Sequence, residues 1–378
     1  MCPDEEDAPN RDPKSVAALR PTRAIVDLNA IVCNYRAISK RVNRAEVIAV
    51  VKADAYGHGI VPVARALQNA GAKGFGVALA EEGLLLREAG ISRTILVLNG
   101  VYAHAHRDVV QAGLTPVIYD LGQAQAFAEA NPGRAVDVHL KIDTGMTRLG
   151  VPDGTLQTFL DRLTMYPSIQ IAGAMTHLAT AGDNPEFVNE QLDRFDRAVA
   201  LLRAAGHSPR VLHAANSEAI FTASRSHYDW VRPGIALYGG GSHSELRPAL
   251  RWRTEVVRVA TIEKGASVGY GQTFVAKKSM TIATLPLGYG DGLMRALSDR
   301  GEVLIGGMRC PIVGRVSMDL TTVDVSQLPH AAVGDEVVII GEQKAARLTA
   351  TDVAARAGTI DYEVLTNISK RVPRSYRG

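Results

Sequence analysis

The sequence lacks a bias toward charge of either sign. Its 378 residues include 42 Lys and Arg against 39 Asp and Glu, a net charge of +3, and the two signs alternate along the whole chain. A nucleic-acid-binding protein would usually concentrate basic residues on one element. The composition therefore gives no support for a nucleic-acid partner and favours small-molecule chemistry.

Cysteine and long apolar runs are also scarce. Cys2, Cys33 and Cys310 lie far apart without a C-x-x-C pair, which argues against a disulfide framework or a zinc knuckle, and we expect no metal site. No apolar run approaches the ~20 residues of a membrane span. The N-terminus is acidic and proline-rich, without the apolar core of a signal peptide. We therefore expect a cytoplasmic protein with no membrane partner and a disordered tail at residues 1–22.

The chain is long enough for two domains, and the first has a repeating pattern. Between residues 23 and 245, short β-branched apolar runs alternate with segments of helical periodicity. Repeated βα units predict an α/β domain with a parallel sheet, and eight of them can close into a (β/α)8 TIM barrel; a doubly wound open sheet is the alternative. The eight runs lie at residues 47–51, 75–79, 94–98, 114–119, 135–142, 169–176, 210–215 and 229–234.

The pattern changes near residue 246. Strand-like runs separated by glycine-rich turns then follow one another without intervening helices, as in "TEVVRVATI" and "DEVVIIG". Only residues 349–358 and 361–369 have helical periodicity. We therefore predict a mostly β C-terminal domain at residues 246–378.

Lys52 is the most unusual residue of the first domain. In "AVVKADAYGHG", residues 49–59, it ends an apolar run that should be a buried strand. Such a lysine can reach solvent along its aliphatic stem, which is the structural interpretation. Alternatively, desolvation lowers its pKa from ~10.4 and leaves a neutral amine that can form a Schiff base with an aldehyde.

Other polar residues follow the predicted strands at what would be the active face of a barrel. They are Lys141 and Asp143 after the fifth run, His177 after the sixth, Asn216 and Ser217 after the seventh, and Arg232 after the eighth. Ser217, in "HAANSEA", and the Pro-Gly turn at 233–234 are placed to bind a phosphate, although either could be a simple N-cap or turn. Arg148, in "KIDTGMTRLG", suits a carboxylate or phenolic oxygen, or belongs to a solvated loop. In the β domain, Tyr270 lies between two glycines and could be a turn aromatic or an acid/base.

Eight motifs in order carry a family resemblance. The chain from about residue 22 to 376 resembles alanine racemase, a pyridoxal-phosphate (PLP) enzyme with a (β/α)8 barrel and a C-terminal β domain. Each motif alone is modest, but their order is specific. The motifs are "VKADAYGHG", "KIDTGMTRLG", "MTHLATAGD", "HAANSEA", "RPGIALYG", "SVGYGQTF", "VGRVSMDL" and "DYEVLTNISKRVPR".

The resemblance implies a two-base racemisation of alanine. Lys52 would form the internal aldimine with PLP and act as the base for D-alanine, and Tyr270 would be the base for L-alanine. Arg232 would face the pyridine nitrogen, with His177 beside it. The residues expected to hold the cofactor phosphate are Tyr56, Ser217, Gly234, Ile235 and Tyr362.

The resemblance also implies a homodimer with shared active sites. Tyr270 and Met318, a substrate contact, would come from the other subunit. Arg148 would lie near the substrate carboxylate, and Lys141 matches a lysine that is often carbamylated. D-Alanine could serve as a cell-wall precursor, or the enzyme could act in alanine catabolism.

The sequence leaves three alternative functions open. A racemase of broader specificity is one, since Phe274 and Gly182 vary from the common motifs and leave substrate range open. A PLP-dependent decarboxylase of the same fold is the second, and a non-catalytic PLP-binding protein is the third. The β domain carrying Tyr270 argues against the last of these.

Overall fold

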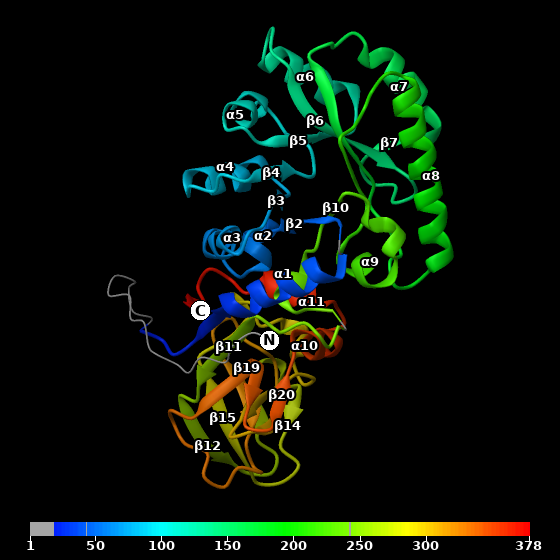
Figure 1. Ribbon diagram of the computed structural model, residues 1–378. Helices are drawn as coiled ribbons and strands as arrows, with labels where there is room; N and C mark the ends of the chain where they lie inside the picture. The colour runs from blue at the N-terminus through cyan, green and yellow to red at the C-terminus, as the bar shows by residue number, and fades with distance from the viewer. Residues whose placement is uncertain (1–18, 43, 242) are drawn as a thin grey trace. The chain divides into compact units, whose positions relative to one another are not determined.

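The computed structural model describes residues 19–42, 44–241 and 243–378, which form two compact units (Figure 1). The barrel unit comprises Asn34–Ala55 and Gly59–Leu237. The C-terminal unit comprises Tyr56–His58, Tyr238–Gly378 and the described residues up to Cys33. Residues 1–18 of the predicted tail lie outside the described residues, and the domain limits drawn from the sequence pattern stay a prediction.

Eight parallel strands close the barrel, as the sequence predicts. Each strand pairs with the next along the chain, and the last pairs with the first. Each of the eight apolar runs supplies one strand, and the short β7 (Val151–Pro152) pairs with β6 at the side. The barrel strands are β2 (Glu46–Val50), β3 (Gly74–Val77), β4 (Thr94–Val97), β5 (Thr115–Ile118), β6 (Val136–Asp143), β8 (Ile169–Met175), β9 (Val211–His213) and β10 (Trp230–Val231).

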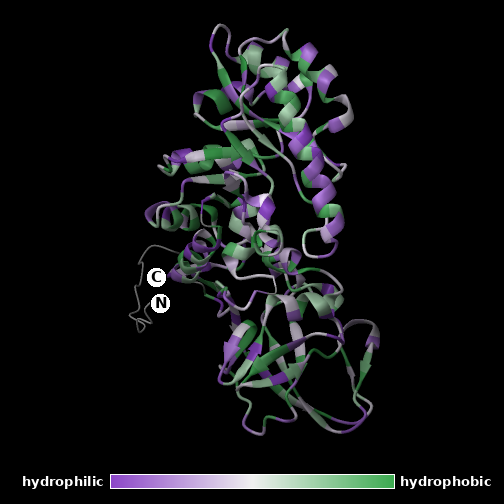
Figure 2. Cartoon of the chain, turned by 45° about the vertical axis from the view of Figure 1, so that its right-hand side comes forward, coloured by the Kyte–Doolittle hydropathy of each residue, from purple (hydrophilic) through white to green (hydrophobic). Residues whose placement is uncertain are grey.

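Amphipathic helices connect the barrel strands, and α8 (Pro185–Ala204) shows why they form. Asn184 caps it by accepting a hydrogen bond from the Phe187 amide, and Pro185 occupies its first turn. Its buried residues recur three and four positions apart, and Figure 2 shows hydrophobic and hydrophilic segments alternating along it. The other connecting helices are α3 (Ile60–Asn69), α4 (Ala80–Glu88), α5 (His106–Gln111), α6 (Leu121–Ala130), α7 (Leu156–Leu163) and α9 (Ser217–Thr222).

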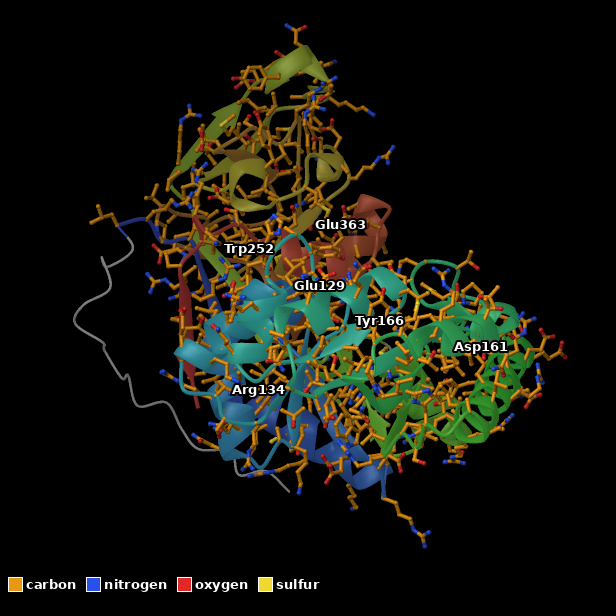
Figure 3. The ribbon with its side chains drawn as sticks, turned by 90° about the horizontal axis from the view of Figure 1, so that it is seen from above. Glu129, Arg134, Asp161, Tyr166, Trp252 and Glu363 are labelled. Carbon is orange, nitrogen blue, oxygen red and sulfur yellow. The ribbon has the colours of Figure 1, made fainter. Side chains whose placement is uncertain are left out.

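The C-terminal unit is mostly β, as predicted. Its main sheet has the order β17-β16-β19-β11-β1-β21, with β20 paired to β19. Trp252 of β11, labelled in Figure 3, is fully buried in this unit. The strands of the sheet are β1 (Arg23–Asp27), β11 (Leu250–Glu255), β16 (Glu302–Ile305), β17 (Met308–Pro311), β19 (Glu336–Gln343), β20 (Ala346–Leu348) and β21 (Arg374–Arg377).

Smaller elements complete this unit. A three-stranded antiparallel sheet contains β12 (Arg258–Ile262), β15 (Met280–Leu285) and β18 (Thr321–Asp324), and β13 (Ser267–Val268) pairs with β14 (Phe274–Val275). The two helices expected from the sequence are α10 (Ala350–Ala357) and α11 (Asp361–Asn367). α1 (Leu28–Val42) begins in this unit and ends in the barrel unit. Within the described ranges, no helix is long and apolar enough to cross a membrane.

A buried ion pair fixes the start of the described chain to the C-terminal unit. Asp291 is fully buried and accepts two hydrogen bonds from the Arg20 guanidinium, at 2.6 and 2.9 Å. Thr22 is also fully buried and bonds to Thr254 and to the Pro286 carbonyl. Because the bidentate pair neutralises a carboxylate that has left water, residues 20–22 contribute directly to the stability of this unit.

We expect Arg20→Met to lower the free energy of unfolding by about 3 kcal/mol, because it leaves a buried carboxylate without its main partner. Arg210→Met is the matched control, since the Arg210–Asp137 pair is exposed and should cost less than about 1 kcal/mol. Urea unfolding at fixed protein concentration measures both. Equal losses in the two variants would contradict the role assigned to Arg20.

Candidate active site

The carboxyl ends of the barrel strands bring several predicted site residues to one edge. Lys52 follows β2, His177 follows β8 and Arg232 follows β10. The register aligns these ends, because Lys141 of β6 pairs with Met175 of β8, which pairs in turn with His213 of β9. This is the edge at which barrel enzymes carry their active sites.

Lys52 opens a left-handed helical turn. Helix α2 (Lys52–Tyr56) has φ and ψ near +50° at Ala53, Asp54 and Ala55, and Tyr56 also has a positive φ of 53°. L-residues avoid this conformation, which costs roughly 1–2 kcal/mol per residue. Strain of this size persists only where the surrounding structure holds it, and it is concentrated at functional sites.

Two carboxylates hold the strained turn. Glu82 of α4 accepts a hydrogen bond from the Ala53 amide at 2.6 Å and another from the Ala78 amide at 2.8 Å. Asp54 accepts from the Ile60 amide at 2.8 Å through its side chain. No sequence pattern indicated either of these roles. Together these bonds fix the backbone immediately after Lys52.

The amines of the site are surrounded by other cations. Burial, followed by the charge of Arg148, lowers the pKa of Lys52, and Glu82 opposes the shift. The pKa of Lys141 falls from 10.5 to about 8, first because of burial and then because of Arg232 and Arg148. Both amines therefore lose a proton more readily than a surface lysine. A neutral amine is what Schiff-base formation at Lys52, or carbamylation of Lys141, requires; carbamylation stays a prediction.

Arg232 is a buried cation whose hydrogen-bond partners are all neutral. One terminal nitrogen donates to the carbonyls of Thr176 and Ala214, at 2.8 and 3.0 Å, and lies 3.5 Å from His177 Nδ1. The other donates to His213 Nδ1 at 2.8 Å. Burial lowers the pKa of Arg232 to about 9, and burial together with Arg232 lowers the pKa of His177 to about 3. His177 is therefore neutral beside a positive charge.

The predicted phosphate residues of the barrel unit lie together. The buried Ser217 hydroxyl accepts hydrogen bonds from the Gly234 amide at 2.8 Å and the Ala236 amide at 3.3 Å. Its own proton thus remains available for donation to an anion. Ile235 begins the 3-10 helix η3 (Ile235–Tyr238) directly after Gly234. Asn216 caps α9 by accepting a hydrogen bond from the Ala219 amide, so the N-cap of this helix is Asn216 and not Ser217.

The remaining predicted site residues belong to the C-terminal unit. Tyr56 and Tyr362 lie together, with ring centroids 5.9 Å apart. Tyr270 starts the 3-10 helix η4 (Tyr270–Gln272) between two glycines of positive φ and is 73% exposed, while Met318 is 52% exposed. Tyr270 and Met318 belong to a different unit from Lys52, and their roles stay predictions.

The sequence reasoning missed two buried histidines below Arg232. His213 lies in the quoted "HAANSEA" motif, and His139 lies two residues before Lys141 in β6. Alternate residues of a strand face the same side, so His139 shares the inward face with Lys141. That spacing was the signal that could have identified it.

This donor set fits an anionic aldehyde cofactor such as PLP. The edge offers an amine with lowered pKa at Lys52, the hydroxyl of Ser217, and the cations of Arg232 and Arg148. A phosphate and a ring oxygen would balance this positive charge, and the amine would bind the aldehyde carbon. Fold and site together define a PLP-dependent barrel enzyme.

Comparisons with known proteins identify the family. Residues 26–242 match the family model "Alanine racemase, N-terminal domain", and residues 249–376 match "Alanine racemase, C-terminal domain". The chain is 43% identical to an alanine racemase of Sorangium cellulosum, over 95% of this chain and all of that one. It is 46% identical to one of Symbiobacterium thermophilum, over 95% of this chain and 98% of that one.

Solved structures agree with the sequence comparisons. Alanine racemase from Bacillus anthracis with bound L-Ala-P superimposes with a TM-score of 0.89 at 34% identity, covering 95% of each chain. Alanine racemase from Bartonella henselae with covalently bound pyridoxal phosphate gives a TM-score of 0.87 at 34% identity, covering 94% of this chain and 99% of that one. The chain belongs to the alanine racemase family.

We expect Lys141→Met to stabilise the cofactor-free protein at pH 7. The pKa of Lys141 is about 8 in the folded chain and 10.5 in the unfolded chain. The charged lysine therefore lowers the stability by its full amount below pH 8, and this penalty disappears as the pH rises towards 10.5. Because each pKa unit is worth about 1.4 kcal/mol, the gain at pH 7 should reach about 3 kcal/mol. Urea unfolding at pH 7 and pH 10 measures it.

The control for this variant is Lys278→Met on the exposed surface of the C-terminal unit, which should change stability by less than about 0.5 kcal/mol at either pH. A gain from Lys141→Met that is the same at pH 7 and pH 10 would show that packing, rather than charge, is responsible.

Proposed function

We propose that this protein interconverts L-alanine and D-alanine by a two-base mechanism that uses Lys52 and Tyr270. The carrying observation is that Lys52 lies at the carboxyl edge of the barrel, where burial and the charge of Arg148 lower its pKa, in a chain of the alanine racemase family. When bound, PLP supplies an electron sink that weakens the Cα–H bond of the amino acid. The remaining tasks fall to the side chains of the protein.

Inversion at Cα requires a proton to leave one face and return to the other. Lys52 Nζ, whose pKa is lowered by burial and by the charge of Arg148, would serve the face from which D-alanine loses its proton. The Tyr270 phenolic oxygen would serve the opposite face. Two separate groups are needed, because a side chain on one side of Cα cannot reach both of its faces.

Positioning falls to residues around these bases. Arg232, with neutral His177 beside it, would face the ring nitrogen and disfavour its protonation. Arg148 would orient the substrate carboxylate through its paired donors. Ser217, Gly234 and Ile235 would hold the phosphate, and Tyr56 and Tyr362 stay predicted contacts of the same group.

We also infer a homodimer with shared sites. Tyr270 and Met318 both expose more than half of their side-chain surface in the single chain, which suits residues that act across a subunit interface. The predicted cytoplasmic location remains a prediction, as does the choice between biosynthetic and catabolic roles. Matches to alanine racemases over the whole chain favour this activity over a decarboxylase or a cofactor carrier.

The reaction is tested with L-alanine in deuterated water. We expect D-alanine labelled with deuterium at Cα, because a proton removed on one face is replaced from solvent-exchanged groups on the other. Lys52→Ala should lose the visible absorption of bound cofactor and all detectable racemisation. Release of carbon dioxide would instead identify a decarboxylase, and equal turnover of serine or lysine would identify a broader racemase.

Tyr270→Phe tests the assignment of the second base. Removing the phenolic hydroxyl should slow loss of the Cα proton from L-alanine by 10²-fold or more, roughly the value of a general base, and should affect D-alanine less. Deuterium wash-in into each enantiomer at early times measures the two rates separately. Equal losses for both enantiomers would overturn the assignment.

Mixing subunits tests whether sites are shared. A heterodimer of Lys52→Ala and Tyr270→Phe subunits has one site with both changes and one intact site if the two residues come from different chains. Unfolding and refolding the two variants together should then restore racemisation that neither variant shows alone. No restoration, with heterodimers present by mass, would place both bases in one chain.

A further inference from the structure

A chain of hydrogen bonds runs from Arg232 into the interior of the barrel. Arg232 donates to His213 Nδ1 at 2.8 Å, and His213 Nε2 lies 2.8 Å from His139 Nδ1. The three residues are 4%, 0% and 3% exposed, respectively. They come from three strands or strand ends of the barrel, so the chain links β10, β9 and β6.

The guanidinium sets the tautomer of both histidines. Arginine only donates, so the Nδ1 atom of His213 must accept and its proton must lie on Nε2. That proton is then donated to His139 Nδ1, which must be unprotonated in turn. His139 is thus the acceptor that makes the required tautomer of His213 stable in a buried site.

Packing around His139 shows that the barrel makes space for it. A Cβ added to Gly173 of β8 would lie 2.5 to 2.7 Å from three atoms of the His139 ring, which no side chain tolerates. On another side the indole of Trp230 stacks on the same ring, with centroids 5.5 Å apart. The imidazole is therefore confined between a glycine and an aromatic plane.

We propose that His139 is a positioning residue for the reaction, which fixes the orientation of the Arg232 guanidinium through His213. This inference rests on the role proposed above for Arg232 at the cofactor ring. Without an acceptor at His139, the buried Nε2 proton of His213 is unsatisfied, and a ring turned to satisfy it no longer accepts from Arg232. The guanidinium then loses one of the bonds that hold it in place.

Three changes to the holoenzyme separate this role from ordinary packing. His139→Leu removes the acceptor. His139→Asn restores one, because its Oδ1 lies as many bonds from Cβ as the imidazole Nδ1. Gly173→Ala displaces the imidazole without removing any polar atom. Gly76→Ala in β3 is its control, because the three atoms nearest to the added methyl group belong to the apolar side chains of Leu98 and Val50.

Visible circular dichroism of the bound cofactor, kcat and KM for alanine, and ring ¹⁵N signals of labelled histidine are measured on each folded variant. We expect His139→Leu and Gly173→Ala to lower kcat about tenfold, the usual scale for an outer partner of a functional group, with KM changed less than about twofold. The dichroic band and the His213 ring signals should change in both variants. His139→Asn should recover most of kcat, and Gly76→Ala should leave the band unchanged.

The inference is overturned if His139→Leu and Gly173→Ala keep kcat and the band, if asparagine gives no recovery, or if Gly76→Ala causes the same loss as Gly173→Ala. Should His139→Leu not fold, the comparison of Gly173→Ala with Gly76→Ala and the asparagine variant still decide. A wild-type protein without a cofactor band or racemisation would instead refute the proposed function, and the histidine ¹⁵N signals of the cofactor-free chain would still test the hydrogen-bond chain.

Discussion

The buried guanidinium of Arg232 is the interaction on which the barrel site depends. Its side chain bonds to the carbonyls of Thr176 and Ala214, and its amide bonds to the Ala215 carbonyl, so one residue joins the ends of β8, β9 and β10. Its partners are neutral, which leaves a full positive charge in a region of low dielectric. The same contacts therefore hold the strand ends together and keep a positive charge at the site.

That charge adds to the effect of burial on its neighbours. Burial, and after it the charge of Arg232, lowers the pKa of Lys141 and His177, and Arg148 acts in the same direction on both. A cofactor that carries a phosphate and a ring oxygen complements these positive charges, while the amine of Lys52 is kept reactive beside them. Burial of the Arg232 charge carries a cost that a bound anion would offset, so binding of an anion would stabilise the fold.

Much of this architecture follows from the sequence. Eight apolar runs identify the eight barrel strands because parallel strands buried on both faces are continuously apolar, and the loss of helical periodicity after residue 246 identifies the β unit. Polar residues at strand ends identify Lys52, His177 and Arg232, since the ends of parallel strands meet at one edge. These features are local, so the periodicity of the apolar residues and the positions of the polar residues suffice to predict them.

The features that the sequence did not predict depend on contacts between segments that are far apart in the chain. Strand β1, at residues 23–27, lies within the range predicted for the barrel, yet it pairs with β11 and β21, because strand pairing depends on partners far along the chain. The left-handed turn after Lys52 has alanines where glycine would be the usual signal, and Glu82 holds it from another helix. The link between His139 and His213 joins residues 74 positions apart, which no local pattern records.

The barrel closes through its two shortest strands. β9 has three residues and β10 has two, and β10 pairs with β9 at the single position Trp230–His213. Amides of Asp229 and Arg232 extend this short seam through hydrogen bonds to the carbonyls of Leu212 and Ala215, and loss of these bonds is the step at which thermal fraying of the cylinder should begin. Ser217, Arg232 and Gly234 all lie beside this seam. A ligand bound to them would therefore stabilise the closed barrel, and opening of the barrel would be linked to dissociation of the ligand.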